Sequence, residues 1–226
     1  MIEFDHVGHS FGERRVLEDI TCTLTESRIG IIGANGSGKS TLARMINGLV
    51  HPDEGTVLVD GLDPRRQGRQ VRQRVSFIFS DPDAQIVMPT VGEDIAFSLR
   101  RRSLTTDEMR ERTNAVLELV GLSGYVDHPA HLLSSGQKQL LALATVLVTE
   151  PSILVCDEPT TLLDLRNTRE IAQLLQSLPQ QVILVTHDLD LIGDYERVLV
   201  IDQGRIVADG TGAESSAFYR DLLGVP

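Results

Sequence analysis

Apolar segments predict strands towards both ends of the chain. Segments 28–32 and 153–156 are short, continuous and apolar, as expected of strands buried on both faces. Residues 41–49 instead repeat apolar side chains at helical spacing and predict a helix. The other predicted strands are 2–7, 16–24, 56–61, 75–79 and 182–186, with a final pair, 198–201 and 205–208, that turns at Gln203-Gly204.

The middle of the chain has the spacing of helices. Thr105 and Glu108 fit a capping box, in which a threonine and a glutamate three residues later cap the same helix start. Apolar positions continue at helical spacing to Gly121, and again over 140–148. The predicted fold is therefore α/β. Its predicted organisation is one domain, 1–226, with an α/β body (1–86 and 151–226) and an inserted helical subdomain (about 87–150).

The composition limits the function classes. The 226 residues include 21 Lys and Arg against 32 Asp and Glu, a net charge of −11, so generic nucleic-acid binding is disfavoured. Cys22 and Cys156 lie in apolar segments without metal-ligand spacing, which is typical of a reducing cytosol. We expect neither a signal peptide nor the ~20-residue apolar run of a membrane span, so any membrane role should be peripheral.

Two clusters of arginines depart from this acidic average. The first comprises Arg65, Arg66, Arg69, Arg72 and Arg74, and the second comprises Arg100, Arg101 and Arg102. They could contact phosphates or lipid headgroups, although a solvated surface is the simpler interpretation of a charged segment.

Residues 33–40 read Gly-Ala-Asn-Gly-Ser-Gly-Lys-Ser and fit the phosphate-binding loop GxxxxGK[ST], the P-loop. Glycines let successive amides face phosphate oxygens, and the following helix adds the positive end of its dipole. Lys39 is expected to reach the β- and γ-phosphates, and the Ser40 hydroxyl to ligate Mg²⁺. The predicted nucleotide-binding residues are Gly33, Asn35, Gly36, Ser37, Gly38, Lys39, Ser40 and Thr41.

Two carboxylates follow the predicted strand 153–156. Ligands of parallel sheets bind beyond the carboxyl ends of the strands, so Asp157 and Glu158 should face the phosphate site. We predict that Asp157 acts on Mg²⁺ with Ser40, and that Glu158 polarises the attacking water. A strand ending in Asp-Glu is common by itself. Its meaning here depends on the P-loop, and together the two motifs predict a site for ATP and Mg²⁺.

Segment 133–139, Leu-Ser-Ser-Gly-Gln-Lys-Gln, resembles the LSGGQ signature of ABC ATPases. It is a second polar loop before a helix, and both its amides and the helix dipole can be directed at phosphate. It cannot serve the nucleotide held by its own 33–40 loop. In the family it closes on the ATP of the opposite subunit, so the resemblance implies nucleotide contacts from Ser134, Ser135, Gly136 and Gln137.

The rest of the chain is similar to an ABC nucleotide-binding domain along nearly its whole length. The resemblance implies a P-loop NTPase (RecA-like) core with an antiparallel β subdomain and an inserted α-helical subdomain. It places Gln85 in the Q-loop as a further Mg²⁺ ligand, His187 beside the γ-phosphate, Asp164 in the D-loop and Phe11 against adenine. The catalytic residues implied are Glu158, His187, Gln85 and Lys39.

Two positions depart from the family pattern. Ser135 stands where the first signature glycine usually lies, which a negative φ would allow. Leu162-Leu163 replaces the usual small pair of the D-loop, which questions its contacts between subunits but not the role of Asp164.

Segments 79–87, 90–97 and 158–167 resemble the energy-coupling-factor (ECF) importers of vitamins and metals. Among these, the chain is most similar to the biotin transporter ATPase, with the cobalt and nickel versions next. The resemblance implies a peripheral protein on the cytoplasmic face of the membrane. Its implied partners are a second ATPase subunit, identical or different, an integral-membrane T subunit and, through it, a substrate-binding S subunit.

Four acids in this region form a candidate contact with the T subunit. The resemblance implies that a coupling helix docks beside Gln85, and basic residues on that helix would attract Asp81, Asp83, Glu93 and Asp94. Solvated loop acids are an equally good interpretation.

The expected activity is ATP hydrolysis coupled to import. Two ATP molecules with Mg²⁺ would join two subunits head to tail, and hydrolysis would reopen them. The alternatives are the ATPase of another ABC importer or exporter, a soluble non-transport ABC ATPase, a P-loop kinase or GTPase, and a regulatory module without turnover. The span from Ser40 to Leu133 is too short for the coiled coils of DNA-repair ATPases, and Glu158 with His187 favours turnover.

Overall fold

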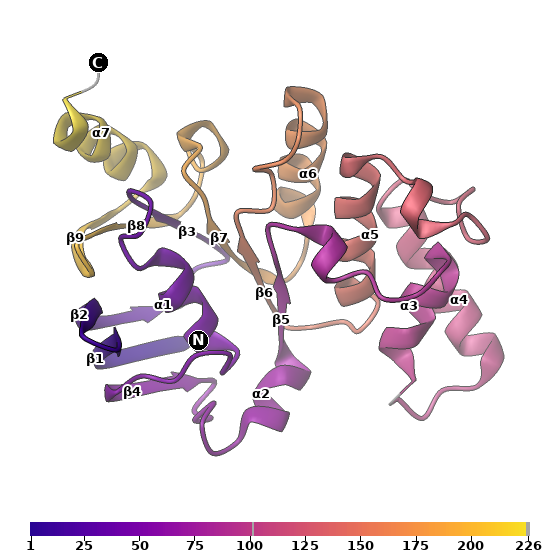
Figure 1. Ribbon diagram of the computed structural model, residues 1–226, viewed down its shortest axis with the longest axis horizontal. Helices are drawn as coiled ribbons and strands as arrows, with labels where there is room; N and C mark the ends of the chain where they lie inside the picture. Colours follow the sequence, from indigo (N-terminus) through magenta and orange to yellow (C-terminus); the bar gives the residue numbers. More distant parts are fainter. Residues whose placement is uncertain (101, 225–226) are drawn as a thin grey trace. The chain divides into compact units, whose positions relative to one another are not determined.

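The computed structural model describes residues 1–100 and 102–224, which form two compact units (Figure 1). The first comprises Met1–Ser76, Ser152–Glu158 and the chain from Pro179 onward, and the second comprises Phe77–Pro151 and Pro159–Leu178. The expected helical segment, about 87–150, lies within the second unit, which also includes 77–86 and 159–178. Arg101 of the second arginine cluster lies outside the residues that the structure describes.

Two sheets build the first unit, and the boundary between the units falls within β5. The smaller sheet is antiparallel in the order β2-β1-β4, with β1 at Ile2–Phe11, β2 at Arg14–Leu24 and β4 at Glu54–Val59. The larger has the order β5-β6-β7-β3-β8-β9 and is parallel from β6 to β8. Its strands are β3 (Arg28–Ile32), β5 (Val75–Ile78), β6 (Ile153–Asp157), β7 (Gln181–Val185), β8 (Arg197–Asp202) and β9 (Arg205–Gly210).

The central parallel strands determine where a ligand can bind. Every residue of β3 and β6 is buried, as expected of strands covered on both faces. In register, Val185 pairs with Asp157 on one side and with Ile31 on the other. The loops that follow these three strands therefore leave the sheet at one edge, where ligands of open α/β sheets bind.

Among the described residues of the first unit there are three α-helices and a short 3-10 helix at Leu189–Leu191. Helix α1 (Lys39–Ile46) contacts β2 and β4 of the smaller sheet and β6 and β7 of the larger, so it packs between them. Helix α2 (Gly68–Arg74) leads into β5, and α7 (Gly212–Leu223) packs on β8 and β9. A capping box formed by Thr211 and Glu214 fixes the start of α7.

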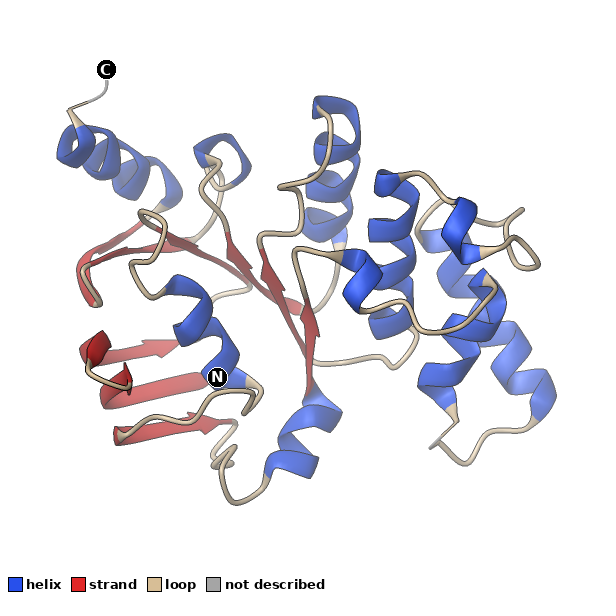
Figure 2. Cartoon of the chain, in the orientation of Figure 1, coloured by secondary structure: helices blue, strands red, loops and turns tan. Residues whose placement is uncertain are grey.

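Apart from the end of β5, Figure 2 shows the second unit as helices and loops. Its helices are α3 (Val91–Leu99), α4 (Thr106–Leu119), α5 (Ser135–Leu147) and α6 (Leu165–Ser177). Helix α5 contacts the other three. Its residues 141–144 are fully buried, so it is the central helix around which the unit is built.

The predicted strands are all present, with ends that differ by a few residues, and the Gln203-Gly204 turn and the capping box at Thr105 are confirmed. The helix expected over 41–49 ends at Ile46, because Gly48 takes a left-handed φ of 73° and two later amides return to the Arg44 carbonyl. Helices α2, α3 and α6 were not predicted, and the helix expected over 140–148 begins at Ser135. Within the described residues, no helix combines the length and apolar character that a membrane crossing requires.

Candidate nucleotide site

The loop between β3 and α1 is shaped by glycine and closed around its own lysine. Gly33 has φ 146°, and a Cβ there would lie 2.0 Å from the carbonyl oxygen of Ile201. No side chain fits that position, so the loop turns directly off the strand. The Ser37 side chain is buried, and within the described chain its Oγ has no hydrogen-bond partner. A buried polar atom of this kind suits a loop that holds a polar ligand.

Lys39 begins α1 with its ammonium group inside the loop. Nζ donates to the carbonyl oxygens of Gly33 at 2.8 Å and Ala34 at 2.9 Å. Burial lowers the pKa of Lys39, and the nearby carboxylates of Glu158 and Asp157 oppose that shift. The site therefore pairs a desolvated cation with two acids from the end of the adjacent sheet.

Asp157 connects the P-loop helix to β6. Its carboxylate is buried, accepts a 2.7 Å hydrogen bond from Ser40 Oγ and lies 3.2 Å from an Arg44 nitrogen. This contact brings together the hydroxyl and carboxylate predicted to share Mg²⁺. Arg44 was not predicted, because nothing in the sequence indicates that α1 directs it at a strand 113 residues later.

Glu158 follows Asp157 at the same edge of the sheet, and it contacts His187 there; we call Asp157 and Glu158 the acidic edge. Glu158 Oε2 lies 2.7 Å from His187 Nδ1. The Glu158 backbone has φ 55°, a left-handed conformation unusual for a residue with a side chain, and its amide donates to Val185 at the end of β7. The turn after β6 thus directs Glu158 to His187, two residues after the end of β7.

Phe11 ends β1 as an exposed ring, with 57% of the residue accessible. Its ring meets that of buried His9 edge-on, with centroids 4.6 Å apart, and His9 Nδ1 lies 3.1 Å from the Asp53 carboxylate. Opposite Phe11 in the hairpin, Arg14 reaches to 3.5 Å from the Gly36 carbonyl of the P-loop. An open aromatic face and a cation therefore border the loop, and Arg14 is a second residue that the sequence did not indicate.

The remaining P-loop residues lie where the motif requires. Asn35 and Gly36 are exposed in the loop, Gly38 is the N-cap of α1, and Ser40 and Thr41 are in its first turn.

The signature segment lies in the second unit, at the start of α5. Ser134 and Gln137 form a capping box: Gln137 N donates to Ser134 Oγ at 3.3 Å, and Ser134 N to Gln137 Oε1 at 3.0 Å. Gln137 Nε2 also donates to the Tyr125 hydroxyl at 3.0 Å. Ser135 is the first helical residue, so its backbone does not require glycine.

The D-loop segment packs against the signature helix. Asp164 caps α6, its carboxylate accepting from Asn167 N at 2.9 Å. The Asn167 side chain lies so close to Gly136 that a Cβ there would be 2.5 Å from it. A groove of about 430 Å³ lies between these elements and exposes Ser134 and Gln137. Leu162 and Leu165 beside it are 60% and 77% exposed.

Gln85 is bound within the second unit. Its Oε1 accepts from Phe79 N at 3.4 Å, and its Nε2 donates to the carbonyl of Ala142 on α5 at 3.3 Å. Both contacts are long, so the amide is held loosely beside α5.

Four acids were predicted to contact a membrane partner, and for Asp94 this prediction is wrong because the residue is buried. It is 2% exposed, and its Oδ1 accepts 2.9 Å hydrogen bonds from the amides of Val87 and Met88. Burial raises the pKa of Asp94, and the two amides oppose that shift. Its position on α3 turns it inward because Val91, Ile95 and Leu99 are buried on the same helix. Asp81, Asp83 and Glu93 are at the surface or part-exposed, although Asp83 pairs with Lys138 at 2.7 Å.

Comparison with known proteins decides the family. The model of the ABC transporter family matches residues 17–161, from β2 through the signature segment to the acidic edge. The chain belongs to the ABC transporter ATP-binding family. The predicted resemblance and the P-loop NTPase fold are thereby confirmed.

Three relatives of this ABC ATPase show how far the likeness extends. The chain is 47% identical to the biotin transport ATP-binding protein BioM of Rhizobium etli, over 98% of each chain. It is 40% identical to the ECF transporter ATP-binding protein EcfA1 of Caldanaerobacter subterraneus, over 91% of this chain and 78% of that one. A solved dimeric cassette, MJ0796 in a post-hydrolysis state bound to ADP and Pi, superposes with a TM-score of 0.80 at 28% identity, covering 93% of this chain and 98% of the other.

Proposed function

We propose that this ABC ATPase is the ATP-hydrolysing subunit of an ECF-type importer, bound to the cytoplasmic face of the membrane through other subunits. The observation that carries the hydrolytic role is the 2.7 Å contact between Glu158 and His187, directly after the buried Asp157 that binds Ser40. The ECF type is supported by the similarity to EcfA1 and BioM. A P-loop that only bound nucleotide would not need a carboxylate held against a histidine at the end of the sheet.

The described residues fit a nucleotide with Mg²⁺. The orphaned Ser37 Oγ and the Lys39 ammonium are the groups that would meet phosphate oxygens, and Ser40 and Asp157 would hold the metal. Bound Mg²⁺ neutralises charge on the terminal phosphates. No group of three or more His, Cys, Asp or Glu among the described residues forms a metal site by itself, which suits an ion held largely by the nucleotide.

Glu158 is placed to act as a base towards water. Its carboxylate is 18% exposed, so it can reach solvent while His187 Nδ1 fixes its orientation. His187 is 58% exposed, and its other ring nitrogen would contact the γ-phosphate. Phe11 would stack on adenine, with Arg14 between it and the loop.

Two chains are needed to finish each site. The signature and D-loop segments expose Ser134, Gln137, Leu162 and Leu165, and we propose that these face the nucleotide and surface of a second ATPase subunit. The dimeric relative supports this arrangement. The exposed leucines would add apolar contact where small residues are usual.

The proposed cargo is a vitamin or metal ion, with biotin first. The support is the 47% identity to a biotin transport ATPase over nearly the whole chain. Uptake of labelled biotin and of cobalt by cells that express the ATPase with its membrane subunits would decide between the two cargoes.

The hydrolytic assignment is tested with Glu158→Gln. The variant should bind ATP normally, hydrolyse it about 10²- to 10³-fold more slowly, and accumulate as an ATP-dependent dimer in light scattering. Glu118→Gln, an exposed change of the same chemistry on α4, should behave as wild type. Wild-type turnover in Glu158→Gln would contradict the base. If the wild-type ATPase rate per subunit did not rise with protein concentration, sites shared between two chains would be contradicted.

A further inference from the structure

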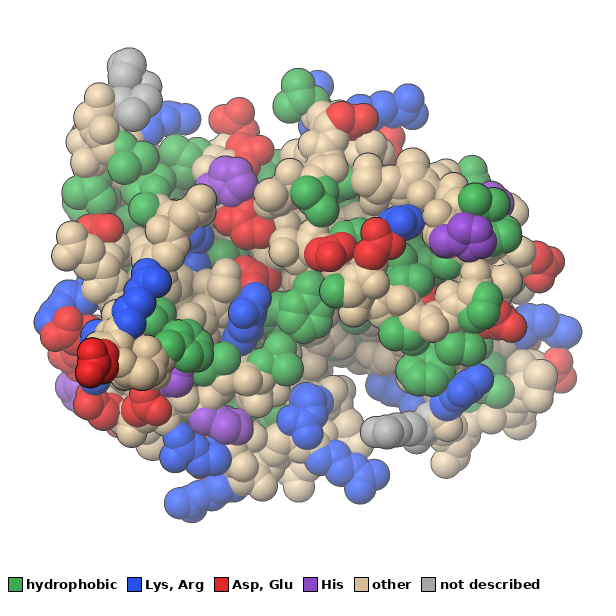
Figure 3. Space-filling view, viewed as in Figure 1, with side chains coloured by type: hydrophobic (Ala, Val, Ile, Leu, Met, Phe, Trp, Pro, Cys, Tyr) green, Lys and Arg blue, Asp and Glu red, His purple; other side chains and the backbone are tan. Residues whose placement is uncertain are grey.

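Five arginines on and before helix α2 form a basic face on this acidic chain. Arg65 and Arg66 lie in the loop before α2, and the other three arginines of the first sequence cluster lie on that helix. Figure 3 shows Lys and Arg side chains gathered at the lower edge, over α2 and this loop. We name Arg65, Arg66, Arg69, Arg72 and Arg74 the arginine face.

The arginine face is only partly neutralised. Arg66 Nε lies 3.5 Å from Asp63, and Arg74 lies 3.3 Å from Asp60, which also binds the N-terminal ammonium. Within residues 1–100 and 102–224, the structure gives Arg69 and Arg72 no acidic partner within 4.0 Å. The face therefore retains positive charge while the chain as a whole is at −11.

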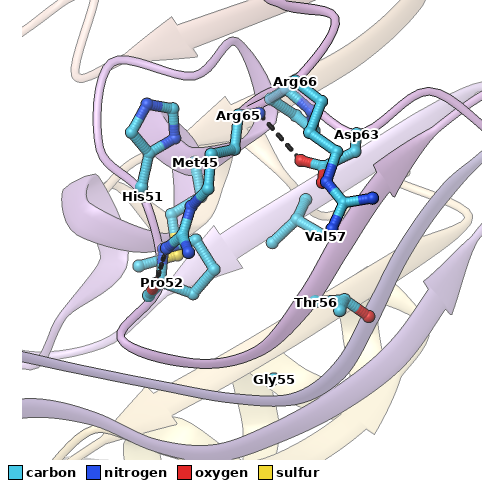
Figure 4. A pocket seen from close by; sticks show the side chains of 10 residues that line it. Met45, His51, Pro52, Gly55, Thr56, Val57, Asp63, Arg65 and Arg66 are labelled. Carbon is cyan, nitrogen blue, oxygen red and sulfur yellow. Dashed lines mark hydrogen bonds and ion pairs between the residues drawn. The ribbon is translucent and has the colours of Figure 1, made fainter.

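A cavity opens between this loop and the end of α1. Its volume is about 130 Å³, roughly ten times the ~10–15 Å³ that one water needs, so a phosphate group fits. Figure 4 shows His51, Arg65 and Arg66 around it, with Thr56 at one side. Arg65 donates to the Pro52 carbonyl, and its amide to Asp63 at 2.8 Å. One guanidinium donor is thus used to orient Arg65, and its remaining donors are available.

The two acids at the start of β4 and just before it are engaged elsewhere. Asp53 accepts from Ser10 N at 2.8 Å and lies beside His9, and Glu54 binds Arg15 through both carboxylate oxygens. Asp63 is then the one acid that lines the described cavity, and two arginines and a histidine outnumber it. An anion entering here would meet a net positive charge.

An exposed apolar residue lies close to the cavity in the chain. Leu49 is 50% exposed and precedes the cavity-lining His51 by two residues, and Gly48 before it packs near Pro64 and His51, which both line the cavity. A basic surface with an exposed leucine at its edge suits the headgroup region of a bilayer, where charge and an apolar side chain act together. An extended nucleic acid would instead meet the net negative charge of the rest of the chain.

We propose that the arginine face binds anionic phospholipid, with one headgroup phosphate in the cavity between His51, Arg65 and Arg66. The inference rests on the peripheral membrane location in the proposed function. It adds a direct lipid contact to whatever the membrane subunits provide.

Flotation of the purified full chain with phosphatidylglycerol and with phosphatidylcholine vesicles tests the proposal. Wild type should bind the anionic vesicles at least tenfold better, and the preference should fall with added salt. Each arginine near an anionic membrane surface strengthens vesicle binding about fivefold. The double variant Arg65→Gln/Arg66→Gln should therefore bind the anionic vesicles about 30-fold more weakly. Arg110→Gln/Arg112→Gln on α4, with the same charge change, should stay within about twofold of wild type.

Three results would overturn the proposal: no preference for anionic vesicles, equal loss in the α4 control, or equally tight binding of duplex DNA. The ATPase rate of every variant is measured alongside and should not change. Lost vesicle binding with intact turnover would be the specific signature of the arginine face. Absent turnover in wild type would refute the proposed function and leave the vesicle result standing.

Discussion

Two helix starts in this ABC ATPase are prepared in opposite ways. Helix α1 begins after Gly38, whose φ is 110°, and among the described residues no side chain caps it. Helix α5 begins with the Ser134–Gln137 capping box. A ligand can therefore accept hydrogen bonds from the first-turn amides of α1, whereas side chains of α5 already accept part of the hydrogen bonds that its own start can donate. We infer that the P-loop is shaped to bind its nucleotide directly, and that the signature loop is held in shape until a second subunit brings one.

The largest effect is expected from Gly33→Ala. The new Cβ would lie 2.0 Å from the Ile201 carbonyl in a backbone with φ 146°, so the loop must move. ATP affinity by calorimetry should fall at least 100-fold. Gly124→Ala has nothing within 4 Å of its Cβ among the described residues and should leave affinity unchanged. If Gly33→Ala kept its affinity for ATP, binding at the uncapped start of α1 would not depend on the turn at Gly33.

The signature helix should respond through turnover rather than binding. In Gly136→Ala the Cβ would lie 2.5 Å from the Asn167 side chain, which would push α5 away from α6. The ATPase rate should fall about tenfold or more at unchanged ATP affinity. The double variant Gly136→Ala/Asn167→Ala should recover most of the rate, because the clash is removed. No recovery would mean that Gly136 acts through its backbone alone.

A smaller effect is expected from Tyr125→Phe. The variant loses the 3.0 Å hydrogen bond from Gln137 Nε2 but keeps the ring. At about 1 kcal/mol for the bond, the ATPase rate should fall up to about fivefold, with ATP affinity unchanged. If Tyr125→Phe had the wild-type rate per subunit at every protein concentration, the capping box would hold Gln137 in place without Tyr125.

The two units also differ in how they hold a buried charge. Lys39 has two carboxylates to oppose its desolvation, whereas Asp94 has two amides. Because burial raises the pKa of Asp94 above its unfolded value, its protonated form stabilises the fold in acid. That contribution is lost as pH rises through the raised pKa. In urea unfolding at pH 7, Asp94→Asn should therefore equal or exceed wild type within about 1 kcal/mol.

Between pH 4 and 7, the gap between wild type and Asp94→Asn should widen in favour of Asn. Asp81→Asn, an exposed change in the same region, should show no such trend. A variant much less stable at pH 7 would mean that the amide contacts with Val87 and Met88 need the full carboxylate charge.

Contiguous motifs made much of this molecule predictable. The P-loop, the Asp157-Glu158 pair and the signature segment each carry their chemistry within a few residues, and the strand ends bring the first two to one edge. Arg14, Arg44, Tyr125 and Asn167 escaped prediction because their partners lie 12 to 113 residues away and depend on how strands and helices align. Asp94 could have been found, since Val91, Ile95 and Leu99 repeat at helical spacing around it.

The left-handed backbone of Glu158 has a consequence for the protein's evolution and engineering. A non-glycine residue at φ 55° is held at a cost of about 1 kcal/mol, which glycine at this position would relieve. A library screened only for heat resistance should therefore enrich Glu158→Gly and recover robust proteins that no longer turn over ATP. Thermostable variants of this chain need a second, catalytic screen at this one position above all.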